Sequence, residues 1–285
     1  MQNWRREIAP NRALQPRPFV YTAGQRDRSG GHVVRIAAMK VATWNVNGIR
    51  ARHTQLLEWV ESAQPDVICL QELKASLAQI PESICNLGGY WCYWHGNAAY
   101  SGVALHLRRD TFPEKPTFTH PHFDHETRIV EARSGDTVFA SVYVPNGGKD
   151  YVAKVEFMKS LIAYARAQRE LGLKLVISGD YNIARTDMDV HPKERKPVIG
   201  QRPEERDLLE AMLAEGLVDV GRKLYPEADD YFSWWAPWRN LRQRNIGWRL
   251  DYVLASEALA ERAVSCPSYR EIGTSDHAPV VATFE

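Results

Sequence analysis

The chain has 285 residues, of which 44% are hydrophobic and 25% charged, and its formal net charge is +1. These values exclude a disordered, collagen-like or coiled-coil chain, and no apolar run approaches the ~18 residues that a membrane span needs. The four cysteines, Cys69, Cys85, Cys92 and Cys266, form no Cys-x-x-Cys pair. They predict reduced, buried thiols and a protein that is not secreted.

Residues 1–38 form a basic segment without helical or strand periodicity. Seven arginines against two acidic residues give it a charge of +5, so residues 39–285 carry −4 of the total. Three interpretations are open: a mis-called start with Met39 as the true first residue, an Arg-rich targeting peptide, or a basic arm that binds DNA. We expect residues 1–38 to be disordered and residues 39–285 to form one folded domain.

From Met39 onward, short apolar runs typical of buried strands mix with amphipathic helices. The runs cover residues 40–46, 66–70, 103–107, 138–144, 173–178, 249–255 and 279–284. Apolar residues recur at helical spacing around residues 56–63, 155–165 and 208–213. A capping box at residues 76–79, and Pro203 followed by two acids, indicate helix starts. The mixture predicts an α/β fold in which two β-sheets pack face to face with helices outside.

Polar side chains follow several of these strands, where open sheets place their ligand sites. Asn45 and Asn47 alternate across the first strand end, so both point to one side. Glu72 follows the second strand and is a natural ligand for a hard cation. Tyr143 ends a later strand, and Asn146 follows in a Pro-Asn-Gly turn. Turn chemistry alone also accounts for the asparagines.

Three further motifs carry ionisable groups. After an apolar strand and Gly179 come Asp180 and Asn182, which are suited to accept a proton from water and to donate to an oxyanion. Asp251 lies inside a hydrophobic strand, where an unpaired charge is costly. His277, just before the last strand, is its obvious partner. Six polar strand-end motifs in one chain favour a catalytic site over six separate structural features.

In order and spacing, the six motifs resemble those of the exonuclease III branch of the endonuclease/exonuclease/phosphatase superfamily. The matching segments are WNVNG-R-A, QE-K, YVPN-G, GDYN-A, NIGWRLDY-L-S and SDHAPV. The resemblance covers residues 39–285. It implies a four-layer α/β sandwich of two mixed β-sheets flanked by helices. It also implies an Mg²⁺-dependent apurinic/apyrimidinic endonuclease, with Mn²⁺ able to replace Mg²⁺.

The resemblance also implies a role for each polar side chain. Glu72 would be the principal metal ligand, and Asn47 and Asp276 would make further or water-mediated metal contacts. Asp180 would orient and deprotonate the attacking water, with Asn45 as its hydrogen-bonding support. These roles suit phosphodiester hydrolysis, which needs an oxygen nucleophile and charge relief on the phosphoryl oxygens.

Five more residues would surround the phosphate. Asn182 and His277 would donate to its oxygens, with Asp251 fixing the imidazole. Tyr143 and Asn146 would also contact the phosphate, and Tyr143 would aid the leaving oxygen.

Residues 231–248 interleave aromatic residues with arginines, a composition that predicts nucleic-acid contact, because arginines track phosphates and aromatics stack. A core aromatic cluster under a solvated basic loop is the alternative. By the resemblance, Trp234, Trp248 and Leu250 would hold a flipped abasic sugar, and Lys149 would press on the duplex. The remaining predicted contacts are Trp238, Arg239, Arg242, Arg244 and Arg249.

The implied partner is double-stranded DNA with abasic sites or 3′ ends, bound by a monomer with no membrane contact. In a bacterium the protein would be cytoplasmic and associated with the nucleoid. Residues 200–206 and 236–238 depart from the usual family pattern and leave the substrate preference open. The balance of abasic-site incision, 3′→5′ exonuclease and 3′-end cleaning stays open, as does the number of metals.

Two other functions compete with this one. A superfamily phosphatase acting on a small phosphorylated substrate would share the same polar residues. A non-catalytic DNA-binding module would have lost a metal or base position.

Overall fold

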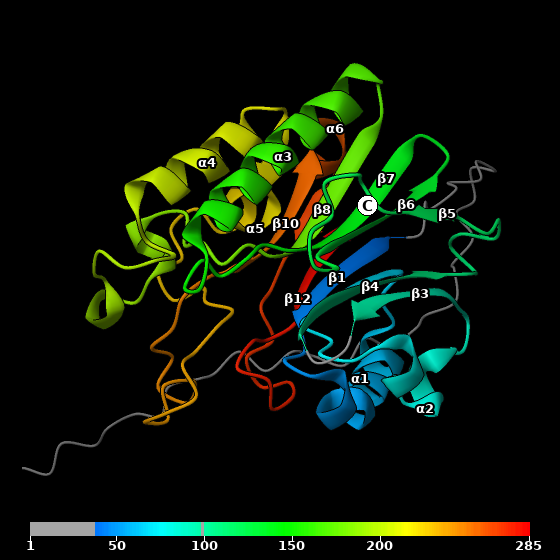
Figure 1. Cartoon of the computed structure of the whole chain (residues 1–285), viewed down its shortest axis with the longest axis horizontal. Helices are drawn as coiled ribbons and strands as arrows, with labels where there is room; N and C mark the ends of the chain where they lie inside the picture. Colours follow the sequence, from blue (N-terminus) through cyan, green and yellow to red (C-terminus); the bar gives the residue numbers. More distant parts are fainter. Residues whose placement is uncertain (1–37, 98–99) are drawn as a thin grey trace, which may run out of the picture. The chain divides into compact units, whose positions relative to one another are not determined.

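The computed structural model describes residues 38–97 and 100–285, which form two six-stranded β-sheets with helices on their outer faces (Figure 1). The predicted disordered arm lies outside the described residues but for residue 38. The division into an arm and a catalytic domain therefore stays a prediction.

The first sheet has the strand order β11-β12-β1-β2-β4-β3. Its central strands β1 (Met39–Asn45) and β2 (Val67–Gln71) run parallel, and its other neighbouring strands pair antiparallel. The remaining strands are β3 (Tyr90–Asn97), β4 (Tyr100–Arg108), β11 (Ala263–Ser265) and β12 (Val280–Phe284).

The second sheet has the order β5-β6-β7-β8-β10-β9. Its central strands β7 (Thr137–Tyr143) and β8 (Lys174–Asp180) are parallel, and β10 (Asp251–Ser256) runs antiparallel to β8. The edge strands are β5 (Thr117–Thr119), β6 (Ile129–Ser134) and β9 (Leu217–Asp219). Both sheets are therefore mixed, as predicted.

Alternation along the strands creates three apolar layers. Val41 of β1 lies in the core between the sheets, whereas Ala42 and Trp44 face a second core beneath α1 (Ile49–Ala63) and α2 (Glu82–Cys85). The other face of the second sheet forms a third core beneath α3 (Tyr151–Glu170) and α4 (Pro203–Leu213). The predicted four-layer α/β sandwich is confirmed.

Elements with strong periodicity were predicted, and short or irregular ones were missed. All seven apolar runs became strands, and Pro203 is the first residue of α4, as predicted. The capping box at Ser76 begins only a single 3₁₀ turn, Leu77–Gln79. The other short helices are Asp187–Asp189, Pro192–Glu194, α5 (Val220–Leu224) and α6 (Glu257–Ala260). None of the described helices is long and apolar enough to cross a membrane.

A histidine is buried in the outer face of the first sheet. His106 of β4 is fully buried and packs against Trp94, with ring centroids 4.5 Å apart. Burial disfavours the charged imidazole and lowers the pKa of His106 to about 3. The unfolded chain therefore binds a proton between about pH 6.5 and 3 that the folded chain does not, so this part of the stability falls as pH drops through that window.

We expect His106→Leu to flatten the acid dependence of stability. Urea unfolding at pH 7.5 and 4.5 would measure it, and the pH-dependent loss in the variant should be smaller by about 3 kcal/mol, from ~1.4 kcal/mol per pH unit over the roughly two units below 6.5. The exposed His122→Leu is the matched control. Equal losses in all three proteins would show that His106 does not contribute.

Candidate active site

The predicted strand-end motifs converge at one end of the two packed sheets. In the backbone register of the second sheet, Asp180 lies opposite Tyr143 on one neighbouring strand and opposite Asp251 on the other. In the first sheet, Asn45 lies opposite Gln71. The buried Asn45 joins the two sheets, because its Nδ2 donates to Oδ2 of Asp180 at 2.9 Å. Side chains far apart in sequence therefore meet because their strands end at the same level.

Glu72 accepts hydrogen bonds from three sides. Asn45 Nδ2 and the Tyr143 hydroxyl donate to Oε1 at 3.0 and 2.8 Å, and Lys74 Nζ lies 2.6 Å from Oε2. Burial alone would raise the pKa of Glu72, but the hydrogen bonds from Asn45 and Lys74 outweigh it and lower the pKa. Glu72 is thus an ionised carboxylate at neutral pH.

The Lys74 ammonium bridges two of the predicted metal ligands. Its Nζ contacts Glu72 Oε2 and donates to Asn47 Oδ1, each at 2.6 Å. Asn47 Nδ2 in turn donates to Asp276 Oδ1 at 2.7 Å. Glu72, Asn47 and Asp276 are therefore linked through Lys74 and Asn47, and their oxygen atoms suit a hard cation, whereas their role as metal ligands stays a prediction. The amine stands in the position of a cation between two of these donors, which shows that the donor set fits one.

Asp180 is a completely buried carboxylate. Its Oδ1 accepts from the backbone N–H of Asn182 at 2.9 Å, and its Oδ2 accepts from Asn45. Burial raises the pKa of Asp180 to about 7, aided by the negative charges of Asp251 and Glu72 and opposed by His277. A carboxylate with this pKa is matched to proton transfer near neutral pH.

His277 pairs with Asp251 as predicted. Its Nδ1 lies 2.8 Å from Asp251 Oδ2, and its Nε2 lies 3.7 Å from Asp180 Oδ2. Burial opposes the charged ring, but the two aspartates outweigh it and raise the pKa of His277 to about 10. The ring is an imidazolium at neutral pH, so Nε2–H is a donor for an anion. Ser275, for which the sequence alone predicts no role, fixes the loop because its hydroxyl donates to the Asn45 carbonyl at 2.7 Å.

The predicted phosphate contacts Asn146 and Asn182 lie side by side. Asn146 Nδ2 donates to Asn182 Oδ1 at 3.1 Å, and Asn182 Nδ2 donates to the Val144 carbonyl at 3.0 Å. Beneath them the buried Lys154 donates to the Asn182 carbonyl at 2.8 Å and pairs with Glu205 at 2.5 Å. This buried ion pair was not predicted, because a lysine in a helix reads as exposed.

An aromatic wall adjoins His277. The rings of Trp234 and Trp248 meet edge to face with centroids 5.4 Å apart, and Trp234 lies 6.4 Å from the His277 ring. Trp234 Nε1 donates to Asp276 Oδ2 at 3.0 Å. Leu250 is largely buried in the same cluster as Trp248. The three residues predicted to hold a sugar therefore lie together beside the polar site.

The basic residues predicted to contact DNA divide into two groups. Lys149, Arg239 and Arg244 are exposed, as is the neighbouring Trp238, to 60%. All three nitrogens of the Arg242 guanidinium instead donate to backbone carbonyls of residues 270–275. We assign Arg242 to holding the loop before His277, and its contact with DNA stays untested.

The prediction for Arg249 was wrong, because this side chain is only 1% exposed and pairs with two buried carboxylates. Arg249 lies 2.7 Å from both Asp189 and Asp219. The ion pairs hold the segment that carries Trp248 against the second sheet.

The arrangement has the parts that hydrolysis of a phosphate ester needs. Oxygen ligands can hold a hard cation, a buried carboxylate can take a proton from water, and an imidazolium can donate to developing negative charge. Of the described residues, Glu72, Asp180 and His277 each place one ligand atom within 4.8 Å of the other two.

Comparisons with known proteins agree with this chemistry. Residues 42–277 match the model of the Endonuclease/Exonuclease/phosphatase family. Recombination repair protein 1 of Drosophila melanogaster is 33% identical over 86% of this chain, which spans 37% of that longer protein. Exodeoxyribonuclease III of Haemophilus influenzae is 33% identical over 87% of this chain and 100% of its own length. The structure of an AP endonuclease from Archaeoglobus fulgidus superposes with a TM-score of 0.78 at 29% identity, covering 87% of this chain and 99% of that one.

Proposed function

Because this chain belongs to the endonuclease/exonuclease/phosphatase family, we propose that it incises duplex DNA on the 5′ side of abasic sites by metal-assisted hydrolysis. The chain is a hydrolase and a DNA repair nuclease of the exonuclease III and AP endonuclease type. One observation carries the mechanism: the carboxylate of Asp180 lies beside the His277 imidazolium and within reach of the Glu72 ligand set.

We assign the metal site to Glu72, with Asn47 and Asp276 as further or water-mediated ligands. Their oxygen donors favour Mg²⁺, and Mn²⁺ in its place. When bound, the cation offsets charge on the phosphate and the leaving oxygen. Lys74 must release Glu72 and Asn47 for this, and its flexible side chain can then turn towards a phosphate.

The chain's own residues position and move the protons. Asp180 accepts the proton of the attacking water, while the hydrogen bonds of Asn45 and of the Asn182 backbone hold its carboxylate in place. His277, held protonated by Asp251, donates from Nε2 to a phosphoryl oxygen. Asn182 and Asn146 present their side-chain amides from the neighbouring loops.

The aromatic wall supports the preference for abasic sites. A sugar turned out of the duplex would meet Trp234, Trp248 and Leu250 beside His277, where a nucleotide with its base has less room. The exposed Lys149, Trp238 and Arg239 suit contact with the duplex on either side. We propose double-stranded DNA as the substrate and a monomer as the active form.

Matched duplexes with and without one abasic analogue test this function. We expect Mg²⁺-dependent cleavage 5′ to the analogue about 10²-fold faster than at the same position of the intact duplex. This ratio corresponds to the few kcal/mol needed to unstack and unpair a normal nucleotide. Equal rates on both duplexes would contradict the preference, and release of phosphate from a small ester unaffected by competing duplex DNA would favour a phosphatase.

Two tryptophan variants test whether the aromatic wall of Trp234 and Trp248 causes the preference for abasic sites. Trp248→Leu should reduce the ratio of the two rates, because it removes one side of the proposed pocket. The exposed Trp238→Leu is the matched control and should weaken binding of both duplexes without changing the ratio.

A further inference from the structure

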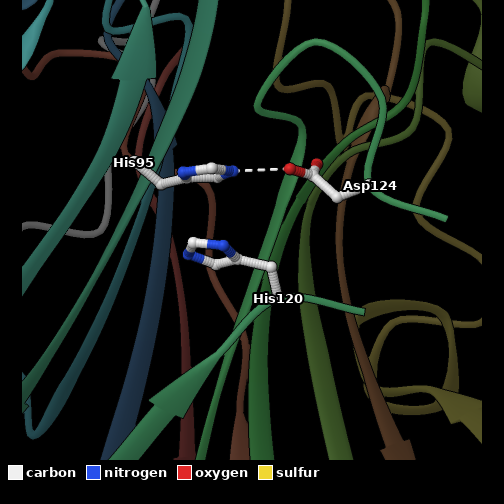
Figure 2. A group of neighbouring side chains, drawn as sticks. All are labelled: His95, His120 and Asp124. Atoms are coloured by element: carbon white, nitrogen blue, oxygen red, sulfur yellow. Dashed lines mark hydrogen bonds and ion pairs between the residues drawn. The ribbon is translucent and has the colours of Figure 1, made fainter. Parts of the chain in front are cut away.

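Two histidines and an aspartate meet where the open edges of the two sheets face each other. His95 belongs to β3, the edge strand of the first sheet, and His120 directly follows β5, the edge strand of the second. Asp124 lies in the loop between β5 and β6. Figure 2 shows the two imidazole rings side by side with the Asp124 carboxylate at the end of the His95 ring. None of these residues belongs to the active site.

The three side chains converge on a small volume. The His95 Nε2 atom lies 2.5 Å from Asp124 Oδ2, and the two rings stack with centroids 3.8 Å apart and an interplanar angle of 20°. One ligand atom from each residue lies within 4.8 Å of the other two. In Figure 2 a nitrogen of His120 faces the same side as the contact between His95 and Asp124.

The surrounding backbone orients the carboxylate. Asp124 Oδ1 accepts the backbone N–H groups of Arg128 and Ile129 at 2.8 and 3.0 Å, which leaves Oδ2 directed at the histidines. Such support of a ligand by backbone hydrogen bonds is typical of metal sites. A simple His-Asp ion pair does not require the second ring, and two stacked imidazolium ions would repel each other.

We propose that His95, His120 and Asp124 bind a zinc-class transition-metal cation that joins the edges of the two sheets. Two imidazoles and one carboxylate favour zinc over Mg²⁺ or Ca²⁺, which prefer oxygen ligands throughout. The site is separate from the Glu72 ligands and does not depend on the proposed nuclease function. Partial desolvation of the ring and the neighbouring His95 lower the pKa of His120, which favours the neutral form that ligation requires.

Binding needs a local rearrangement. Tetrahedral zinc with bonds of about 2.0–2.1 Å places its ligand atoms ~3.3 Å apart, so His95 Nε2 and Asp124 Oδ2 must separate from 2.5 Å and the stacked His120 ring must turn one nitrogen towards them. His120 is exposed at the end of a three-residue strand, so its ring can move towards the other two. The cation would fix the loop that leads to Arg128, whose guanidinium lies 4.7 Å above the ring of Tyr143.

The experiment is a Zn²⁺ titration of chelator-stripped full-length protein in saturating Mg²⁺, which occupies the Glu72 site. Calorimetry gives the stoichiometry, and thermal unfolding gives Tm. We expect one zinc that is lost in His120→Ala and retained in the matched control His122→Ala. At free zinc 100-fold above Kd, the wild-type Tm should rise by about 5 °C or more, whereas His120→Ala should not respond.

A second variant separates ligation from folding. Asp124→Asn keeps an oxygen for the two backbone N–H groups but loses the anionic ligand, so it should fold normally and bind zinc at least tenfold more weakly. Co²⁺ in place of Zn²⁺ should give visible absorption in the wild type that is absent in His120→Ala. Equal zinc stoichiometry and equal Tm shifts in the wild type, His120→Ala and Asp124→Asn would overturn the proposal. That outcome would not bear on the nuclease function, which is measured separately as DNA cleavage in Mg²⁺.

Discussion

Replacement of Asp180 by asparagine is expected to reduce the single-turnover rate on abasic-site DNA by about 10²–10⁴-fold, the usual contribution of a general base. The amide has nearly the same shape but cannot take a proton from water. Asn45 Nδ2 and the Asn182 N–H donate to different oxygens of Asp180, so the amide keeps an acceptor for only one of them and loses one hydrogen bond. We therefore expect the variant to bind DNA as tightly as the wild type or more tightly, because one negative charge near the phosphate is lost.

Single-turnover kinetics and a direct binding measurement separate these effects. Asp187→Asn is the matched control, since its side chain is 69% exposed and, among residues 38–97 and 100–285, pairs only with Arg206. Its rate should remain within twofold of the wild-type rate, roughly the effect of a surface substitution of ±0.5 kcal/mol. Near-wild-type turnover in Asp180→Asn would require a different base.

The same carboxylate predicts the direction of the pH dependence. Burial raises the pKa of Asp180 to about 7, so its active, ionised form is lost as pH falls through that value. A bound cation would move the transition lower. The wild-type rate should therefore rise with pH along an acidic limb that is absent in Asp180→Asn.

Most of the polar site could be predicted because its residue types are unusual where they stand. A carboxylate such as Asp251 inside an apolar strand needs a partner, and His277 supplies it. The roles came from the order of the motifs, since spacing along the chain does not show which strand ends face each other. Only the packing of the two sheets places Asn45 against Asp180.

The residues that were missed or misassigned show what sequence cannot report. Arg249 was predicted to contact DNA, and Lys154 lies in a helix where a lysine is usually exposed, yet both are buried in ion pairs that fix loops of the site. The strand β3 was not predicted, because its aromatic and polar residues lack clear alternation. The sequence does not show that β3 and β5 are edge strands that face each other. It therefore gives no reason to place His95 next to His120.

Removal of divalent cations is expected to abolish DNA cleavage, and Mg²⁺ or Mn²⁺ should restore it, whereas Ca²⁺ should do so poorly. The predicted ligands are all oxygen atoms, which select hard cations. Glu72→Gln should raise the Mg²⁺ concentration for half-maximal activity by about 10–100-fold, as is typical for disturbing a metal site. The exposed Glu58→Gln is the control and should leave it unchanged. Cleavage that persists after thorough chelation would remove the metal mechanism.

Lys74 provides the opposite test of the same site. Its ammonium contacts both Glu72 and Asn47 and must be displaced before a cation can take its place. Lys74→Met removes the competing charge and restores full repulsion among the carboxylates, so Mg²⁺ should bind more tightly. Calorimetric titration without DNA measures the affinity for Mg²⁺. We expect this affinity to fall in Glu72→Gln and to rise in Lys74→Met. If both variants weakened Mg²⁺ binding, Lys74 would be holding the ligands in place and not competing for them.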